Sequence, residues 1–278
     1  MGEGNTKITI TIPAFEYGGA GAELLNYSFG KMVEQTFKDF DIVVSDSSPD
    51  DDVKEMCEKW GDKLDIKYVS SLESKGNPAQ NLNIAMRHAK GDWIKILCQD
   101  DYLLYTDSME MLNDAISGLK NGEQWIATAY LHSKTRKSFF NYHAPYLNPQ
   151  LYIVNTIGTP SCVTIKNNPD ILMFFDEELS YCYDCELYYR LFKAHGNPRI
   201  LTDVTIVNYI WENSITASIT KDIISKENKY IIEKHGIGKE QQEEESSDGP
   251  KLLEDGEFKI DDVVSELSAS PLEKEEEK

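Results

Sequence analysis

Residues 77–101, NPAQNLNIAMRHAKGDWIKILCQDD, contain a complete helix, turn and strand and point directly to a fold class. Pro78 stands near the start of the expected helix, where its missing N–H costs nothing, and Gly91 follows as a stop signal. The apolar run Ile94–Cys98 then predicts a buried strand, which ends abruptly in Gln99–Asp101. A strand of this kind either stops at the solvent or delivers negative charge to a ligand.

The preceding residues repeat the same alternation. Residues 7–12 (KITITI) alternate β-branched with polar side chains and run into a proline, which is typical of a strand entering a loop. Residues 22–37 have apolar positions at helical spacing, and residues 42–44 predict a second buried strand. A helix from about residue 50 to 60 and a third strand in KLDIKYV (63–69) follow. Strands that alternate with helices predict a mainly parallel sheet with helices on both faces.

Polar clusters follow three of these expected strands, at Pro13–Glu16, Ser45–Ser48 and Gln99–Asp101. Ligands of open parallel sheets bind in the crevice outside the carboxyl ends of the strands. We therefore expect the three clusters to converge on one crevice.

The second half of the chain adds further elements. Strands are expected at 124–131, 161–166 and 199–211, and helices at 182–195 and 221–236. The segment SKTRKSFFNYHAPYLNPQ (133–150) is polar, basic and aromatic, which predicts a loop or lid. Residues 239–278 hold 15 acidic and 5 basic residues with few aromatics, so we expect a solvated, disordered tail, with binding of a short helix to a partner as the alternative.

Composition excludes several function classes. The formal net charge is −20, half of it from the tail, so the chain has no sequence-wide basic character of the kind that nucleic-acid binding requires. The chain has no run of 18 apolar residues and its N-terminus, MGEGNTKITI, lacks signal-peptide features, which predicts a soluble, cytoplasmic protein without a transmembrane segment. The five cysteines fit reduced thiols, and the pair Cys182 and Cys185 lacks the second CxxC or spaced His of a zinc site.

Four stretches together resemble family 2 glycosyltransferases of the GT-A fold: ITITIPAFE, QTFKDFDIVVSDSS, the stretch 77–101 and FFDEELSYCYDCELYYRLFKAHG. They span about residues 7–196 in family order. The resemblance implies an α/β, GT-A-like Rossmann-type mostly parallel sheet flanked by helices, with a C-terminal acceptor-side subregion. The domain would cover residues 1–238, with a donor half of about 1–105 and an acceptor half of about 106–238.

The resemblance also implies a donor site for a nucleotide-sugar. Asp46 matches the family carboxylate that accepts a hydrogen bond from the base N3–H, which favours uracil or thymine, although carboxylates also bind guanine. The alternative is that Asp46 caps its own turn with the nearby serines. Phe15 stands where the family often has an aromatic ring that stacks on the base, and Pro13 and Glu16 would shape the pocket edge.

Asp100 matches the last carboxylate of the family's DxD motif and is the expected ligand of Mn²⁺ or Mg²⁺. Such an ion neutralises the charge that develops on the leaving nucleoside diphosphate. Neighbouring side chains of an extended strand point to opposite sides, so Asp101 is assigned to a ribose contact or to the surroundings of the metal. Cys98 replaces the first Asp of the motif, which would weaken metal affinity. The alternative is a solvated strand end, or a cap for a helix starting near Thr106.

Asp184 resembles the family's catalytic carboxylate, with Arg190 matching an Arg that follows it. In that role it removes the proton of the acceptor hydroxyl as the oxygen attacks the anomeric carbon. Tyr183 stands where relatives usually carry Glu, which removes one negative neighbour. A single base and no evident nucleophile imply one in-line displacement with inversion. Asp184 could also, or instead, cap the helix 185–195.

Gln80 and Asn81 occupy the positions of the family's Arg-Asn, and the loss of the Arg leaves the donor open. The glycine-rich run YGGAGA (17–22) predicts a flexible loop at the donor pocket. Lys134, Arg136 and Lys137 could clamp a pyrophosphate or a phosphorylated lipid acceptor, or form a plain surface loop.

The leading hypothesis is an inverting, metal-assisted hexosyltransferase that moves a sugar from a UDP-sugar to a glycan, lipid-linked or protein acceptor. A nucleotidyltransferase is one alternative, but the loop PAFEYGGAGA lacks the Lys or Arg expected of that class. The other is a degenerate scaffold that only binds a sugar nucleotide or a partner. The three departures from the family pattern (Gln80, Cys98 and Tyr183) favour the scaffold, and the retained carboxylates favour an enzyme.

Overall fold

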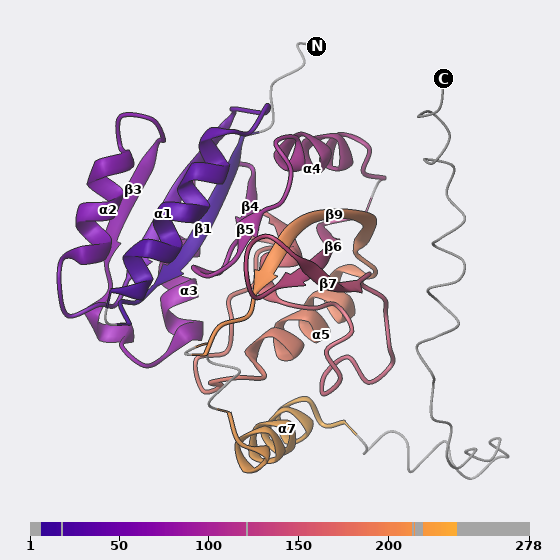
Figure 1. Cartoon of the computed structure of the whole chain (residues 1–278). Helices are drawn as coiled ribbons and strands as arrows, with labels where there is room; N and C mark the ends of the chain where they lie inside the picture. Colours follow the sequence, from indigo (N-terminus) through magenta and orange to yellow (C-terminus); the bar gives the residue numbers. More distant parts are fainter. Residues whose placement is uncertain (1–6, 18, 121, 213, 215–218, 238–278) are drawn as a thin grey trace, which may run out of the picture. The chain divides into compact units, whose positions relative to one another are not determined.

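Four parallel strands form the N-terminal half of the sheet, in the order β3-β2-β1-β4 (Figure 1). They are β1 (Ile8–Ala14), β2 (Phe40–Asp46), β3 (Ile66–Ser70) and β4 (Trp93–Ile96). The structure is a computed structural model that describes residues 7–17, 19–120, 122–212, 214 and 219–237. Those up to His235 belong to one unit, and the predicted tail lies outside the described residues.

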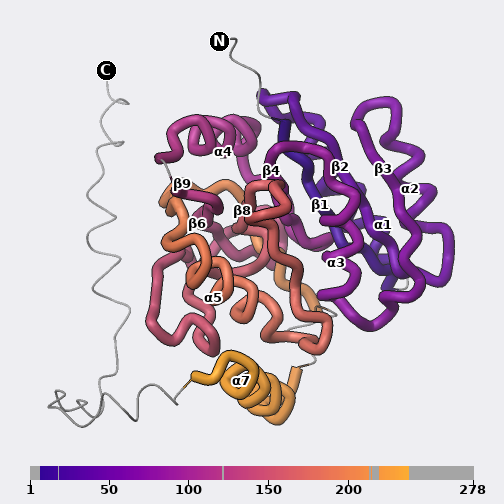
Figure 2. The backbone as a smooth tube through the Cα atoms, turned by 180° about the vertical axis from the view of Figure 1, so that it is seen from behind, coloured from indigo at the N-terminus to yellow at the C-terminus, as the bar shows by residue number. Residues whose placement is uncertain are grey.

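Helices cover both faces of these strands. The chain moves outward from β1 through α1 (Ala20–Val33), β2, α2 (Asp52–Trp60) and β3, and returns through α3 (Pro78–Arg87) to β4 on the other side of β1. Because each crossover is right-handed, α1 and α2 lie on one face and α3 on the other, as Figures 1 and 2 show from opposite sides. The predicted alternation of strands and helices is confirmed.

The second half extends the same sheet through β8, β6, β9 and β5, with β7 pairing only with β6 among the described strands. The strands are β5 (Tyr102–Leu103), β6 (Trp125–Ser133), β7 (Phe139–His143), β8 (Val163–Lys166) and β9 (Arg199–Tyr209). The helices of this half are α4 (Ser108–Ser117), α5 (Tyr183–His195) and α7 (Lys221–His235), and a short 3₁₀ turn, η2 (Pro160–Cys162), precedes β8. Another 3₁₀ turn, η1 (Leu72–Ser74), lies in the first half, between β3 and α3. The fold is α/β, as predicted.

Strand β1 is buried on both faces, although its sequence alternates. Ile10 and Thr11 are both 0% exposed, because helices cover each side of the sheet. Thr9 is also fully buried, and its hydroxyl donates to Asp41 (2.6 Å) and accepts from the Gly91 N–H (2.8 Å). Here the polar positions of an alternating strand mark satisfied hydrogen bonds in the core.

The expected lid at 133–150 is wrong in part, because its centre is strand β7, which pairs antiparallel with β6. Arg136 lies in the connecting turn at φ 60° and forms an ion pair with Glu23 of α1 (2.6 Å). Its guanidinium also lies over the rings of Tyr27 (4.2 Å) and Tyr209 (4.8 Å). Arg136 therefore fastens the hairpin to α1 and β9. A phosphate contact through Lys134, Arg136 and Lys137 stays a prediction.

The helix predicted at 22–37 begins and ends earlier than expected. It starts at Ala20, so half of the glycine-rich run is its first turn, and it ends at Val33. Gln35 is buried and its side chain bonds to the carbonyl of Tyr105 (2.8 Å) and the N–H of Met109 (2.9 Å). These bonds to the start of α4 replace further helical turns.

All five cysteines are free thiols, in agreement with the prediction. No helix within the described residues combines the length and apolar character needed to cross a membrane.

Candidate active site

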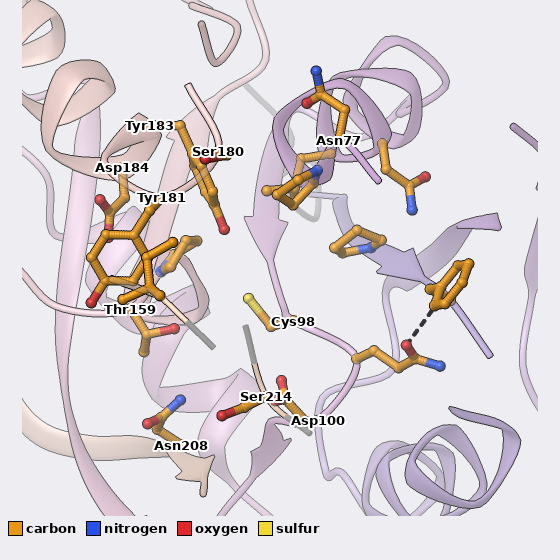
Figure 3. A pocket seen from close by; sticks show the side chains of 18 of the residues that line it. Asn77, Cys98, Asp100, Thr159, Ser180, Tyr181, Tyr183, Asp184, Asn208 and Ser214 are labelled. Atoms are coloured by element: carbon orange, nitrogen blue, oxygen red, sulfur yellow. Dashed lines mark hydrogen bonds between the residues drawn. The ribbon is translucent and has the colours of Figure 1, made fainter. Parts of the chain in front are cut away.

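A cavity of about 1080 Å³ opens where the carboxyl ends of β1 and β4 face the second half of the chain. It holds five of the nine predicted site residues: Pro13, Phe15, Asn81, Asp100 and Asp184. In Figure 3, Asp100 and Asp184 come from different walls, and Cys98 lies between them in this view. The other four predicted residues, Glu16, Asp46, Gln80 and Asp101, do not line the cavity.

Asp100 and Asp101 have different environments. Asp100 lines the cavity and accepts a hydrogen bond from the indole N–H of Trp211 (3.0 Å). Asp101 is fully buried and accepts from the side chains of Thr159 (3.3 Å) and Asn208 (3.0 Å) and from the Tyr209 N–H (3.0 Å). Burial and the charge of Asp100 raise the pKa of Asp101 to about 8. Asp101 therefore links the end of β4 to β9, and a ribose contact through it stays a prediction.

Asp184 stands in the first turn of α5, where the helix dipole favours negative charge. One carboxylate oxygen accepts from the Cys185 N–H (2.7 Å) and the other from the Asn155 side chain (2.6 Å). Burial raises the pKa of Asp184 to about 7, against the opposing effect of the Cys185 N–H. A carboxyl group with this pKa can accept a proton near neutral pH. Arg190 is directed elsewhere, to Glu186 (2.7 Å).

Asp46 lies behind the cavity and is 1% exposed. Its carboxylate accepts from the N–H of Ser48 (2.9 Å), from the Ser48 hydroxyl (2.5 Å) and from the Tyr68 hydroxyl (2.9 Å). This is the turn-capping arrangement that the sequence left as an alternative. A direct contact with a base stays a prediction, because Asp46 does not line the cavity.

Glu16 caps α1 rather than facing the cavity. Its carboxylate accepts from the backbone N–H groups of Gly19, Gly21 (3.2 Å) and Ala22 (2.9 Å). A Cβ at Gly21 would lie 2.4 Å from the Phe15 carbonyl oxygen, so only glycine allows α1 to approach the end of β1 this closely. Within the expected flexible loop, Gly19–Ala22 form a tightly bonded helix start.

Asn81 holds the start of α3 against the strand ends. Its amide donates to the Ala14 carbonyl (3.0 Å), and its oxygen accepts from Ser71 (2.9 Å). Gln80 is half-buried outside the cavity, and its N–H bonds to the Asn77 side chain (2.9 Å) that caps the helix. Asn77, which the sequence analysis did not single out, lines the cavity in its place.

Comparison with known protein families gives a match over about the first half of the chain. Residues 9–142 match the model of the family described as Glycosyl transferase family 2. Residues 9–142 therefore belong to glycosyl transferase family 2. This match covers β1 to β7 and contains the donor-side residues, whereas Asp184 and helices α5 and α7 of the glycosyltransferase lie beyond it.

Two curated relatives of the glycosyltransferase are 31% identical over short stretches. One is the poly(ribitol-phosphate) β-N-acetylglucosaminyltransferase TarS of Staphylococcus aureus, over 112 residues that make up 39% of this chain and 18% of TarS. The other is the GalNAc(5)-diNAcBac-PP-undecaprenol β-1,3-glucosyltransferase of Campylobacter jejuni, over 99 residues, 35% of this chain and 31% of the relative. The matches therefore span less than a third of either relative.

Solved structures show the same fold. S. aureus TarS 1–349 in complex with UDP-GlcNAc has a TM-score of 0.60 at 18% identity, covering 81% of this chain and 66% of that chain. The mannosyltransferase PcManGT of Pyrobaculum calidifontis, in complex with GDP-Man and Mn²⁺, has a TM-score of 0.57 at 18% identity, covering 77% and 60%. At this identity the likeness establishes the GT-A fold of the glycosyltransferase.

The glycosyltransferase offers one carboxylate to a divalent cation. Among its described residues, no group of three His, Cys, Asp or Glu side chains could hold an ion. The oxygens of Asp101 are taken by protein donors, and burial with the nearby Asp101 and Asp100 raises the pKa of the Cys98 thiol well above its usual value. Asp100 alone still fits Mg²⁺ or Mn²⁺, which bind through one or two carboxylates together with substrate phosphates.

Sequence analysis missed Trp211, which reaches Asp100 from the loop after β9. Its ring packs edge-on against Tyr17 (5.5 Å between centroids), which packs against Phe15 (4.8 Å). These rings and the bond to Asp100 connect the end of β1 with that loop. Because Trp211 and Asp100 are 111 residues apart, no local pattern could have paired them.

Proposed function

We propose that this glycosyltransferase moves a hexose from a UDP-sugar to a hydroxyl of a glycan, lipid-linked or protein acceptor, with inversion at the anomeric carbon. The observation that carries the proposal is the placement of Asp100 and Asp184 on one cavity, at family positions for the donor phosphates and for the acceptor. The donor half would be about residues 1–105 and the acceptor half about 106–238.

The donor nucleotide would lie against the ends of β1 and β4. Phe15 is held there by the bond from its N–H to Gln99 (2.9 Å), and its ring is the group that would contact the base. Pro13 and Asn81 line the same part of the cavity, where the sugar nucleotide would enter. UDP is favoured because the carboxylate of Asp46, at the end of β2, is the acceptor that a base N3–H requires, provided that the cavity opens to Asp46 when the donor binds.

Charge on the leaving nucleoside diphosphate must be neutralised in an otherwise acidic protein. Asp100 would hold Mn²⁺ or Mg²⁺ together with the pyrophosphate, and the ion would supply positive charge to the departing phosphate oxygens. The indole of Trp211 bonds to one carboxylate oxygen of Asp100 in the structure. A carboxylate has about four acceptor sites, so Asp100 can keep this bond while it binds a cation.

Asp184 would act as the general base. Its carboxylate is oriented by the Cys185 N–H and the Asn155 amide, and it has the pKa needed to take the acceptor's proton near pH 7. The Cys98 thiol has a raised pKa and stays protonated, which makes it a poor nucleophile. One base without a covalent intermediate supports a single displacement and therefore inversion.

Calorimetric titration of UDP, GDP and dTDP tests the donor site, with and without Mn²⁺, on the native protein and on Asp100→Ala. We expect UDP to bind in a Mn²⁺-dependent manner and the variant to lose that dependence. Binding of GDP instead of UDP would show that the donor is a GDP-sugar. Absence of binding for every nucleotide, with or without Mn²⁺, would favour the degenerate scaffold over an enzyme.

A further inference from the structure

Glu227 of helix α7 binds a loop of the cavity wall. Its carboxylate accepts hydrogen bonds from the backbone N–H groups of Ser180 (2.8 Å), Tyr181 (3.1 Å) and Cys182 (2.7 Å), and from the Ser180 hydroxyl (2.5 Å). Glu227 is only 8% exposed. Burial alone would raise its pKa, but these bonds outweigh burial and hold the pKa of Glu227 below its usual value. The side chain is thus an anion that binds three consecutive N–H groups.

The bound loop leads directly into the proposed base. Cys182 is the residue before α5, and Asp184 follows two positions later. Ser180 to Cys185 all line the cavity, and Figure 3 shows Ser180, Tyr181, Tyr183 and Asp184 grouped on one wall. Any movement of this backbone therefore moves the carboxylate of Asp184 relative to an acceptor.

A second carboxylate, this time on α5, binds side chains of α7. Glu186 of α5 is fully buried and accepts from Lys234 (2.8 Å) and His235 (3.0 Å) at the end of α7. Its other contact is Arg190, one turn further along α5 (2.7 Å). With Glu227 bonded to the loop before α5 and Glu186 bonded to the end of α7, the two helices are held at two places.

We infer that Glu227 is a positioning residue for the transfer reaction, which places the Asp184 loop through three backbone hydrogen bonds. The inference rests on the proposed function, because it assigns Glu227 a role only through Asp184. A displacement of about 1 Å in a reacting group can cost about 10²-fold in rate, so a residue that touches no substrate can still control turnover. It gives Glu227 a role in catalysis, although the helix that carries it, α7, lies outside the family match.

The test compares Glu227→Gln with Glu233→Gln, a matched variant on the same helix. Glutamine keeps the shape of Glu227 but turns one of its acceptors into a donor that faces N–H groups. Glu233 is an exposed residue whose ion pair with Lys229 spans 3.7 Å. Turnover is measured as UDP release from UDP-glucose, UDP-galactose and their N-acetyl forms, with water as the acceptor. Hydrogen exchange of the Ser180–Cys182 amides is followed on the same proteins.

For Glu227→Gln we expect faster exchange of these amides and a kcat about 10- to 100-fold lower, with KM and UDP affinity within about twofold of the native values. Glu233→Gln should match the native protein. Glu227→Asp keeps the charge but is one methylene shorter, so it should lie between the two, and it replaces Glu227→Gln if that variant does not fold. A purely structural role would move KM and thermal stability without this selective loss of kcat.

Two results overturn the inference: a kcat within twofold of native in Glu227→Gln, or unchanged exchange of the loop amides. A native protein that turns over no sugar nucleotide would refute the proposed function and the catalytic role of Glu227 with it. The exchange rates would then still decide whether Glu227 holds the loop, so the two failures are distinguishable.

Discussion

The pH dependence of turnover provides a sharp test of Asp184 as the base. Burial raises its pKa to about 7, and only the deprotonated carboxylate can accept a proton, so the rate must rise with pH. About one tenth of the groups are ionised at pH 6 and about nine tenths at pH 8, which predicts a rise in kcat of roughly tenfold over this interval. Asp184→Asn should lose about 10²- to 10⁴-fold and show no such rise.

Initial rates of UDP release at saturating UDP-sugar, from pH 5.5 to 8.5, measure this dependence. Asp203→Asn is the control, because Asp203 is an exposed carboxylate on β9 outside the cavity. It should retain the native rate and the native midpoint. A midpoint near pH 4, the ordinary value for a carboxyl group, or an Asp184→Asn variant with more than about a tenth of the native rate would refute the assignment.

The same pKa shift predicts an effect on stability. The folded-state pKa of about 7 lies above the value of about 3.9 in an unfolded chain, so the folded protein binds one more proton between these values. The free energy of unfolding therefore falls as pH rises through this window, and the loss is complete above pH 7. Relative to the native protein, Asp184→Asn should raise the melting temperature more at pH 8 than at pH 4. An equal effect at both pH values would contradict the shift.

Three further predictions concern the cavity and the packing of α1. Asp100→Asn should abolish the Mn²⁺ dependence of UDP binding in calorimetry, and a variant with native Mn²⁺ dependence would exclude Asp100 as the ligand. Trp211→Phe keeps the ring but removes the N–H bond that orients Asp100, so UDP with Mn²⁺ should bind about fivefold more weakly, which corresponds to about 1 kcal/mol; unchanged binding would show that this bond does not position the carboxylate. Gly21→Ala places a Cβ 2.4 Å from the Phe15 oxygen and should lower the free energy of unfolding by about 1–3 kcal/mol in urea. Gly30→Ala in the same helix, 3.9 Å from its nearest neighbour, should instead raise it by up to about 1 kcal/mol, and equal effects would refute the steric argument.

The helices and strands of the N-terminal half could be predicted from local sequence signals. Pro78 begins α3 as expected, and the apolar run after Gly91 is β4. These elements were predictable because their signals, the fixed φ of proline and the burial of consecutive apolar residues, act within a few positions. The sequence also indicated two carboxylates that line the cavity, Asp100 and Asp184, through the pattern shared with the family.

Long-range partners decided the rest. Asp100 and Asp101 are adjacent carboxylates. The donors that β9 and the turn before β8 bring to Asp101 bury it, and Asp100 is left on the cavity. The predicted lid is a hairpin because β6 offers its edge to β7, a pairing that local composition does not encode. Glu227 lies on an amphipathic helix whose sequence marks it as an ordinary surface acid. It acquires a role because tertiary packing places three consecutive backbone N–H groups of the Asp184 loop against its carboxylate, and a buried N–H must find an acceptor.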